Sequence, residues 1–333
     1  MNARTILVTG GAGYIGSHVV RQLGEAGENV VVLDDLSTGF RQAVLHGDLV
    51  VGNTGDESCL EQLFSDYDID TVMHFAAHTI VPESVANPLK YYRNNTAASR
   101  TLLEWSLQAS VKHVVFSSTA AVYGIPECGV AREDTPTAPI NPYGTSKLMT
   151  EMMLRDVATV NPLSYVALRY FNVAGSDPDC RIGQSTPKAT LLTKVACEVA
   201  VGKRDEIKIF GTDYDTPDGT GVRDYIHVED LASVHLAALA YLRAGGNSTV
   251  MNAGYGHGYS VREVIAMVEK VAGHEIRKAE VERRAGDPPT LVAAVDKIHA
   301  TLDWRPQFDD LETICASSLA WEHELAAGRW QAA

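Results

Sequence analysis

Tyr143 and Lys147 stand four positions apart within residues 141–147. On a helix this spacing places both side chains on one face, one turn apart. Oxidising a secondary alcohol needs a base that removes the hydroxyl proton while hydride leaves the carbon. A tyrosine, with an ordinary pKa of about 10, becomes such a base when a nearby ammonium group and a nicotinamide ring supply positive charge. Alone, such a pair is common by chance and would usually lie on the surface; together with a glycine-rich turn, an acid at Asp34 and hydroxyls at a strand end, it predicts alcohol oxidation with a nicotinamide cofactor and Tyr143 as the base.

Three hydroxyl side chains, Ser117, Ser118 and Thr119, follow an apolar run that begins at His113. The run predicts a strand, and ligands of open parallel sheets bind beyond the carboxyl ends of the strands. We therefore expect these hydroxyls close to Tyr143. A serine hydrolase using His113 is not favoured, because no G-x-S-x-G turn surrounds either serine.

Gly10, Gly13 and Gly16 form a G-x-x-G-x-x-G run between a predicted strand and a predicted helix. The first glycine permits a tight turn, the second lets the backbone approach a pyrophosphate, and the third allows the helix to pack closely. Asp34 ends the second predicted strand, where an acid accepts hydrogen bonds from ribose hydroxyls and repels a 2′-phosphate. These residues predict a bound dinucleotide and favour NAD over NADP.

Strands and helices alternate through the first half of the chain. We expect strands at residues 5–9, 29–33, 71–76, 113–118 and 165–169, and helices at about 16–25, 94–108 and 143–160. This order predicts an α/β protein with a Rossmann-type doubly wound parallel sheet. Beyond Asn172, loops rich in Gly, Pro and Asp separate shorter elements, including a helix at 260–272 with the capping pair Ser260 and Glu263. We predict an NAD-binding domain over 1–172, with the catalytic helix, and a smaller C-terminal α/β region over 173–333 that mainly binds substrate.

Composition narrows the classes of partner. The 333 residues carry a formal net charge of −14, which argues against nucleic acid or an anionic membrane as partner. Without an apolar run of membrane-spanning length or a signal-peptide pattern, we expect a cytoplasmic protein. The five cysteines are scattered without a CxxC pair, which disfavours a disulfide framework or a thiolate metal site. His74 and His78 have metal-ligand spacing only on a helix; they follow a predicted strand, so we expect a structural role and no metal.

The order of short motifs along nearly the whole chain resembles the UDP-glucose 4-epimerase (UDP-galactose 4-epimerase) family of extended short-chain dehydrogenases/reductases. The motifs are TGGAGYIG, HFAA, YYRNN, FSSTAAVYG, PYGTSK, RYFN, GTGVRDYIHV and RRAGD. The resemblance implies a 4-epimerase that interconverts UDP-galactose and UDP-glucose through a transient 4-keto sugar, with NAD retained. It further implies that Tyr143 is the base, that Lys147 tunes it and binds the nicotinamide ribose, and that Thr119 hydrogen-bonds the sugar O4.

The resemblance also implies the remaining contacts. Besides the residues above, those to the cofactor are Tyr14, Ile15, Asp35, Asn53, Thr54, Phe75, Ala76, Ala77, Asn94, Ser117 and Tyr170. Those to the UDP-hexose are Thr119, Tyr143, Phe171, Asn172, Leu192, Phe210, Arg223, Tyr225, Arg284, Asp287 and Leu291. Within this set, the two arginines would bind the pyrophosphate, with Asn172 on the diphosphate, Phe210 by the uracil and Asp287 on its ribose. Guanidinium forks suit a pyrophosphate well.

Several positions discriminate among relatives on this fold. Sugar-nucleotide dehydratases and UDP-glucuronate decarboxylases use acids just after the threonine, where this chain has Ala120 and Ala121, which cannot move a proton. Asn53 stands where relatives often have an Asp at the adenine, Thr79 replaces a Lys that reaches the cofactor phosphates, and Leu191 replaces an Asn or His near the UDP.

Leu291 aligns with a gate that is Tyr in hexose-restricted relatives and Cys or Ser in those that admit N-acetylhexosamines. Its intermediate bulk favours UDP-glucose and UDP-galactose and leaves N-acetylhexosamine or pentose sugars open. A non-catalytic NAD-binding protein and a net oxidoreductase are the remaining alternatives. In the family, the equivalents of helices 94–108 and 143–160 form a four-helix dimer interface, so we expect a homodimer.

Overall fold

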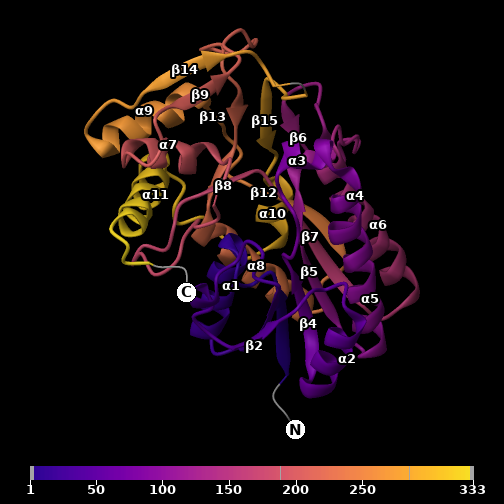
Figure 1. Ribbon diagram of the computed structural model, residues 1–333. Helices are drawn as coiled ribbons and strands as arrows, with labels where there is room; N and C mark the ends of the chain where they lie inside the picture. The colour runs from indigo at the N-terminus through magenta and orange to yellow at the C-terminus, as the bar shows by residue number, and fades with distance from the viewer. Residues whose placement is uncertain (1–3, 188, 285, 331–333) are drawn as a thin grey trace.

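The computed structural model describes residues 4–187, 189–284 and 286–330, and a seven-stranded parallel sheet forms its centre (Figure 1). The strands are β1 (Thr5–Thr9), β2 (Asn29–Asp34), β3 (Asp48–Val51), β4 (Ile69–His74), β5 (His113–Thr119), β7 (Ser164–Tyr170) and β12 (Thr249–Ala253). Their order across the sheet is β12-β7-β5-β4-β1-β2-β3, and every neighbouring pair runs parallel. The predicted doubly wound Rossmann-type fold is confirmed.

Side chains of each central strand alternate between two apolar layers, as expected for a sheet buried on both faces. In β1, Ile6 and Val8 pack into one core cluster and Leu7 into another. The first cluster includes side chains of α1 (Tyr14–Glu25) and α8 (Val228–Arg243). The second includes side chains of α2 (Glu57–Asp66), α5 (Ala98–Gln108) and α6 (Pro142–Val160). The helices thus hold the carboxyl ends of the strands in fixed register.

The predicted elements differ from the structure mainly at their ends. The strand expected at 71–76 begins at Ile69 and ends at His74, because Phe75 and Ala76 turn to donate their N–H groups to Thr9 O, 2.9 and 3.1 Å away. The helix expected at 94–108 begins as a π-helical turn, η2 (Tyr92–Ala97), and continues as α5. The helix expected at 260–272 is α9 (Val261–Ala272), and its predicted capping pair is present.

The second half of the chain gathers beyond one end of the large sheet, above it in Figure 1. Its helices are α7 (Leu192–Ala200), α9, α10 (Asp296–Thr301) and α11 (Leu311–Ala326). A four-stranded sheet has the order β13 (Tyr259–Ser260), β10 (Val222–Arg223), β15 (Thr290–Ala293), β6 (Val130–Ala131). Two pairs of strands complete it: β8 (Asn172–Ala174) with β11 (Tyr225–His227), and β9 (Ile207–Phe210) with β14 (Lys278–Val281).

Short helical pieces connect these parts: η1 (Arg41–Ala43), α3 (Val81–Ala86), α4 (Pro88–Tyr91) and η3 (Ala120–Tyr123). Two elements beyond residue 172 belong to the large sheet. Strand β12 pairs with β7 at its edge, and α8 covers one face beside α1. The chain therefore returns to the cofactor half after it has begun the second region.

Candidate active site

The glycine-rich turn between β1 and α1 has no room for side chains at two of its glycines. Gly10 adopts a φ of 71°, and a Cβ there would lie 2.6 Å from Ala76 N. A Cβ on Gly16 would lie 2.2 Å from Gly10 O, so α1 packs directly on the turn. Gly13 caps α1 without any side-chain hydrogen bond, which leaves the helix N-terminus open to an anion. The turn thus fits a pyrophosphate.

Asp34 lies buried at the end of β2, beside this turn. Its Oδ2 accepts the Ala12 N–H at 3.0 Å and its Oδ1 accepts the Leu36 N–H at 2.8 Å. Burial raises the pKa of Asp34, although the two backbone N–H groups act in the opposite direction. Each oxygen keeps acceptor capacity for a ribose hydroxyl. The acid and the glycine turn together fit a dinucleotide such as NAD.

Other residues expected at the cofactor surround Asp34. Asp35 accepts hydrogen bonds from Ser37 N at 3.0 Å and from Asn53 Nδ2 at 3.1 Å. The Asn53 Oδ1 already accepts from Gly55 N at 2.8 Å, so a contact to adenine would share this oxygen. Thr54 is buried next to it. The structure therefore places this predicted group along the carboxyl ends of β2 and β3.

The predicted catalytic pair, Tyr143 and Lys147, lies at the start of α6. Asn141 caps the helix through Oδ1, which accepts the Gly144 N–H at 2.9 Å. The Tyr143 hydroxyl forms a hydrogen bond with Thr119, whose Oγ1 also accepts the Ala121 N–H at 3.1 Å. The Lys147 Nζ donates to Ser117 O at 2.8 Å. The structure thus brings Tyr143, Lys147 and the hydroxyl strand end together, as their spacing predicts.

The Ser117 hydroxyl forms a short hydrogen bond with the hydroxyl of Tyr170, on the next strand. The opposite border of the cofactor region is formed by Phe75, whose ring lies 4.7 Å from that of His235, and by Ala76 and Ala77. Asn94 lies in the π-helical turn and donates to Asn95 Oδ1 at 3.2 Å. These predicted cofactor residues border the same strand ends.

The electrostatics of the pair differ from the simple expectation. Tyr143 is partly exposed as a residue, yet the burial of its phenol raises its pKa, and the Thr119 hydrogen bond lowers it only in part. Burial lowers the pKa of Lys147 to about 7, and the Glu151 carboxylate acts against this change. Within the described chain, burial is the larger influence on the phenol. The side chains around the phenol therefore leave the pKa of Tyr143 above its ordinary value.

Sequence reasoning missed a buried ionic group behind the pair. Glu151 accepts from Arg169 Nε at 2.9 Å and from Arg169 Nη2 at 2.5 Å, and the Ser118 hydroxyl donates a short hydrogen bond to it. Its position four residues after Lys147, on the same helix face, was the available signal. The sequence does not show that Arg169, on the strand that directly follows the helix, would turn its side chain toward it.

A second missed network connects the glycine turn with the catalytic helix. His74 Nδ1 pairs with Thr9 Oγ1 and its Nε2 with Ser99 Oγ, both at 2.7 Å. The Ser99 hydroxyl donates to Asn95 O at 2.6 Å, and Asn95 Nδ2 donates to Ser146 Oγ at 3.0 Å. Burial lowers the pKa of His74 to about 3, so the ring stays neutral. His74 therefore has the expected structural role.

Residues predicted for the substrate lie on the other side of the strand ends. Asn172 and Tyr225 are register partners in β8 and β11, and their side chains hydrogen-bond. The Arg284 guanidinium lies 3.7 Å from the centroid of the Phe210 ring, and so covers the ring expected beside uracil. Arg223 Nη1 donates to Val222 O at 2.8 Å. Each guanidinium keeps further N–H donors beyond these contacts.

Three further predicted positions frame this side. Asp287 is exposed and its N–H donates to Arg284 O at 3.3 Å, while Ala285 of the same motif lies outside the described residues. Leu291 on β15 packs with Phe171 against a small core formed by η3 and β6. Leu192 is the first residue of α7. Leu291 and Phe171 are thus apolar walls near Thr119.

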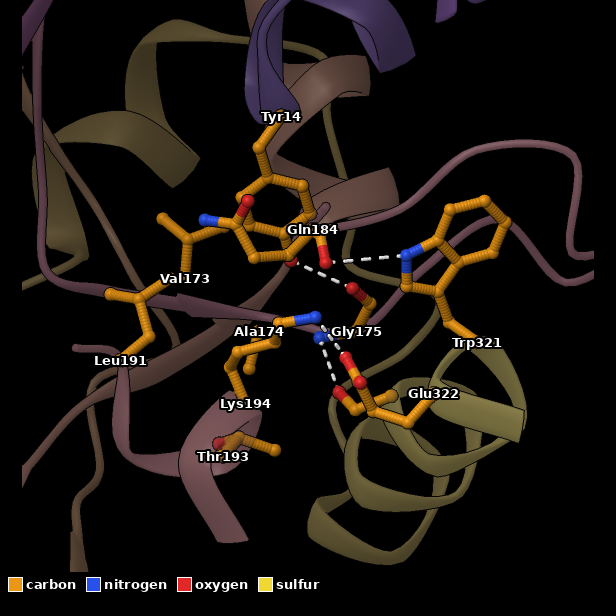
Figure 2. Close-up of a pocket in the computed structure, with 11 residues that line it drawn as sticks. Tyr14, Val173, Ala174, Gly175, Gln184, Leu191, Thr193, Lys194, Trp321 and Glu322 are labelled. Atoms are coloured by element: carbon orange, nitrogen blue, oxygen red, sulfur yellow. Dashed lines mark hydrogen bonds and ion pairs between the residues drawn. The ribbon is translucent and has the colours of Figure 1, made fainter. Parts of the chain in front are cut away.

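Tyr14 extends away from the glycine turn into the second region (Figure 2). Its hydroxyl donates to Gly175 O at 2.7 Å, beside a cavity of about 20 Å³ that Leu191 also lines. A buried ion pair between Lys194 and Glu322 closes the other side of this cavity. Only the backbone of Tyr14 therefore remains at the cofactor turn, and Leu191 lies in this cavity.

The described residues also bear on metal binding, membrane insertion and disulfide bonding. Across residues 4–187, 189–284 and 286–330, no cluster of three or more His, Cys, Asp or Glu side chains has the arrangement of a metal site. No described helix combines the length and the apolar character needed to cross a bilayer. All five cysteines are free thiols.

Comparisons with known proteins agree on one family. Residues 6–254 match the sequence profile of the NAD dependent epimerase/dehydratase family. A UDP-glucose 4-epimerase of Azospirillum brasilense is 56% identical over 98% of this chain and 94% of that protein. The structure of the Brucella ovis UDP-glucose 4-epimerase in complex with NAD matches with a TM-score of 0.93 and 42% identity, covering 96% of this chain and 98% of that one. The UDP-Glc/GlcNAc 4-epimerase of Campylobacter jejuni matches with a TM-score of 0.85 and 49% identity, covering 97% of this chain and 100% of that one.

Proposed function

This chain belongs to the NAD-dependent epimerase/dehydratase family, and we propose that it is a UDP-glucose 4-epimerase that interconverts UDP-galactose and UDP-glucose. The observation that carries this proposal is the arrangement of Tyr143 and Lys147 against the Ser117–Thr119 strand end, beside a turn that fits a dinucleotide. Ala120 and Ala121 add no acid to the strand end. Alcohol chemistry without elimination of water is the reaction that such a site supports.

Each side chain of the site has a separate role at the sugar. Bound NAD supplies a hydride acceptor and donor for C4, together with positive charge beside the phenol. Tyr143 removes the O4 proton as the carbonyl forms and returns it to the opposite epimer. Thr119 holds O4 in line with the phenol, and its own oxygen is fixed by the Ala121 N–H. Lys147 stabilises the ionised phenol and would hold the nicotinamide ribose.

We propose that the UDP part of the substrate binds to the second region, mainly residues 173–333. Arg223 and Arg284 supply charge for the pyrophosphate, and Asn172, Phe210 and Asp287 surround the rest of the nucleotide. Tight binding of the UDP part keeps the substrate on the enzyme. The hexose ring itself need not be held tightly, so it can turn over in the pocket. The exposed position of Arg284 leaves it free to move onto a ligand.

The test is Tyr143→Phe, with Tyr241→Phe as the matched control. Loss of the base should lower conversion of UDP-galactose to UDP-glucose by at least about 100-fold, the usual scale for general acid–base catalysis. NAD content should stay at the wild-type level. The Tyr241 hydroxyl, near the C-terminal end of α8, donates to Asn247 O in the loop that follows the helix, so its removal should leave turnover intact. Unchanged activity in Tyr143→Phe would refute the assignment.

The same assay separates the alternatives. A non-catalytic NAD-binding protein would convert no UDP-sugar in the wild type. A net oxidoreductase would accumulate NADH in proportion to product, whereas an epimerase returns every hydride and accumulates none. Turnover without added NAD is expected, because the cofactor is retained.

We favour the hexose pair as substrates, with UDP-N-acetylhexosamines as the second candidate and UDP-pentoses after them. The C. jejuni enzyme named for both glucose and N-acetylglucosamine substrates is 49% identical, which is the observation that favours this second candidate. Leu291, beside Phe171, is the residue expected to decide between these substrates. Purified protein should be given UDP-galactose, UDP-N-acetylgalactosamine and UDP-arabinose in parallel. Comparable or faster turnover of the N-acetyl sugar would overturn the hexose preference.

We also propose a cytoplasmic homodimer built through residues 94–108 and 143–160. Met149 and Met152 on α6 are 41% and 43% exposed, a pattern that favours a packed partner over water. Light scattering of the purified protein should give twice the chain mass of 36.0 kDa. Replacing both methionines by glutamate should lower that mass to one chain.

A further inference from the structure

Glu151 is a buried acid on the helix that carries the catalytic pair. It lies on α6 with 5% of its surface exposed, one helical turn beyond Lys147. Tyr143, Lys147 and Glu151 therefore repeat at four-residue spacing along one face of the helix. A buried carboxylate is costly unless charged or hydrogen-bonding partners compensate it. The contacts of Glu151 must account for its position.

Those contacts join three elements. Arg169 on β7 binds both carboxylate oxygens, with Nε 2.9 Å from Oε1 and Nη2 2.5 Å from Oε2. Such a two-point guanidinium contact fixes orientation as well as distance. Ser118 on β5 donates its hydroxyl to Oε1. One carboxylate therefore connects α6 with the adjacent ends of β5 and β7.

The link to Ser118 lies between the two catalytic contacts of β5. The residue before it, Ser117, accepts the Lys147 ammonium at its carbonyl oxygen. The residue after it, Thr119, hydrogen-bonds the Tyr143 phenol. A shift of Ser118 would therefore move both contacts at once. Glu151 touches neither the phenol nor the ammonium within hydrogen-bonding distance, so its effect on catalysis must be indirect.

The charge of Glu151 also acts on Lys147. Burial lowers the pKa of Lys147 to about 7, and Glu151 is the group that opposes this change. Of the other groups packed nearby, His74 on β4 is neutral because burial lowers its pKa to about 3. Arg169 is occupied by Glu151, and burial raises the pKa of Tyr170, which is hydrogen-bonded to Ser117. The acid one turn away is therefore the negative charge that favours the ammonium.

We propose that Glu151 is a positioning residue for the epimerase reaction: it fixes the Ser117–Thr119 strand end against α6 and places a negative charge one helical turn from the Lys147 ammonium. The inference rests on the proposed function and deepens it, because it names a residue outside the reach of substrate and cofactor. Arg169 and Ser118 are its partners in this role.

The experiment compares Glu151→Gln with Ser118→Ala as the matched control. Glutamine keeps the shape of the side chain and removes its charge, so the basic limb of the kcat profile should move to lower pH by about one unit or more. The KM for UDP-galactose should change by less than about twofold, because the nucleotide contacts are distant. Ser118→Ala removes the hydrogen bond between β5 and Glu151 and keeps the charge of Glu151. Its kcat should therefore fall, while the basic limb of the pH profile stays at its wild-type position.

A direct titration of Lys147 gives a readout besides activity. NMR of isotope-labelled lysine side chains, with Lys147→Met to assign the signal, should show its pKa lowered in Glu151→Gln and unchanged in Ser118→Ala. A uniform loss of activity with an unmoved limb and an unmoved Lys147 signal would overturn the proposal. Should Glu151→Gln fail to fold, Glu151→Asp keeps the charge on a side chain one methylene shorter, which weakens the contacts with Ser118 and Arg169. Its kcat should fall with the limb in place, and a wild-type kcat would overturn the proposal equally.

Failure of this inference and failure of the proposed function give different results. Without epimerase activity in the wild type, the proposed function itself is wrong. With an active wild type and a Glu151→Gln variant that matches it in pH profile, only the role of Glu151 is wrong.

Discussion

Replacing Gly16 by alanine tests whether the close contact of α1 with the glycine turn supports the fold. The new Cβ would lie 2.2 Å from Gly10 O and 2.8 Å from Gly11 Cα, both backbone atoms that cannot rotate away. Non-bonded contacts settle near 3.5 Å, so the turn must retreat from the helix by about 1 Å. Overpacking of this kind costs about 1–3 kcal/mol, which is a factor of roughly 5 to 150 in the folding equilibrium.

The assay is urea denaturation of the cofactor-free protein, compared with two other glycine variants. In Gly13→Ala the Cβ meets only Gly10 O at 3.2 Å, so the free energy of unfolding should change little while NAD affinity falls. In Gly27→Ala nothing lies within 4 Å, and only the left-handed backbone, with a φ of 79°, is strained, which costs about 1 kcal/mol. An unfolding free energy of Gly16→Ala within about 0.5 kcal/mol of wild type would refute the packing argument.

The remaining predictions concern charge at three separate places. Asp34→Asn should narrow the preference for NAD over NADP, because it removes the charge that repels a 2′-phosphate; cofactor binding by the variant, measured for both nucleotides, checks this. His74 is neutral when folded, with a pKa of about 3 against an ordinary 6.5. The free energy of unfolding therefore contains the full effect of neutral His74 above pH 6.5. As the pH drops toward 3, it falls by about 1.4 kcal/mol per pH unit, because the unfolded chain binds a proton that the folded chain does not. Urea titrations of His74→Gln at several pH values should lack this slope. Arg284→Ala should raise the KM for UDP-galactose at least about tenfold with kcat less affected, since a charge-assisted hydrogen bond contributes about 1.5–3 kcal/mol. An unchanged KM would show that Arg284 does not bind the UDP part of the substrate.

Local patterns in the sequence were enough to predict the glycine-rich turn and the placement of Tyr143 and Lys147 beside the Ser117–Thr119 strand end. The glycine spacing follows from steric limits that act within a few residues, and the positions of Tyr143 and Lys147 follow from the helical repeat. Motif resemblance extended the prediction to Asn172 and Tyr225, which the structure places side by side. In each case the relevant neighbours lie close in the chain or within a recognisable motif.

Contacts between distant segments could not be predicted in the same way. Nothing near Glu151 in the sequence indicates that Arg169 and Ser118 both bind it, because the two residues meet there only through the packing of α6 on neighbouring strands β5 and β7. The stacking of Arg284 on Phe210 depends likewise on the pairing of β9 with β14, which brings two loops together. The early end of β4 at His74 reflects hydrogen bonds to Thr9, and the apolar run continues past it.

The late return of the chain to the large sheet has a consequence for its synthesis. Six of the seven strands have been made by Tyr170, but β12 and α8 follow only after much of the second region. Until then the face that carries Ile6 and Val8 lacks the helix that covers it beside α1. A nascent chain of this kind exposes apolar surface to solvent and to other chains, and such species aggregate. We expect chains arrested before residue 228 to depend on chaperones.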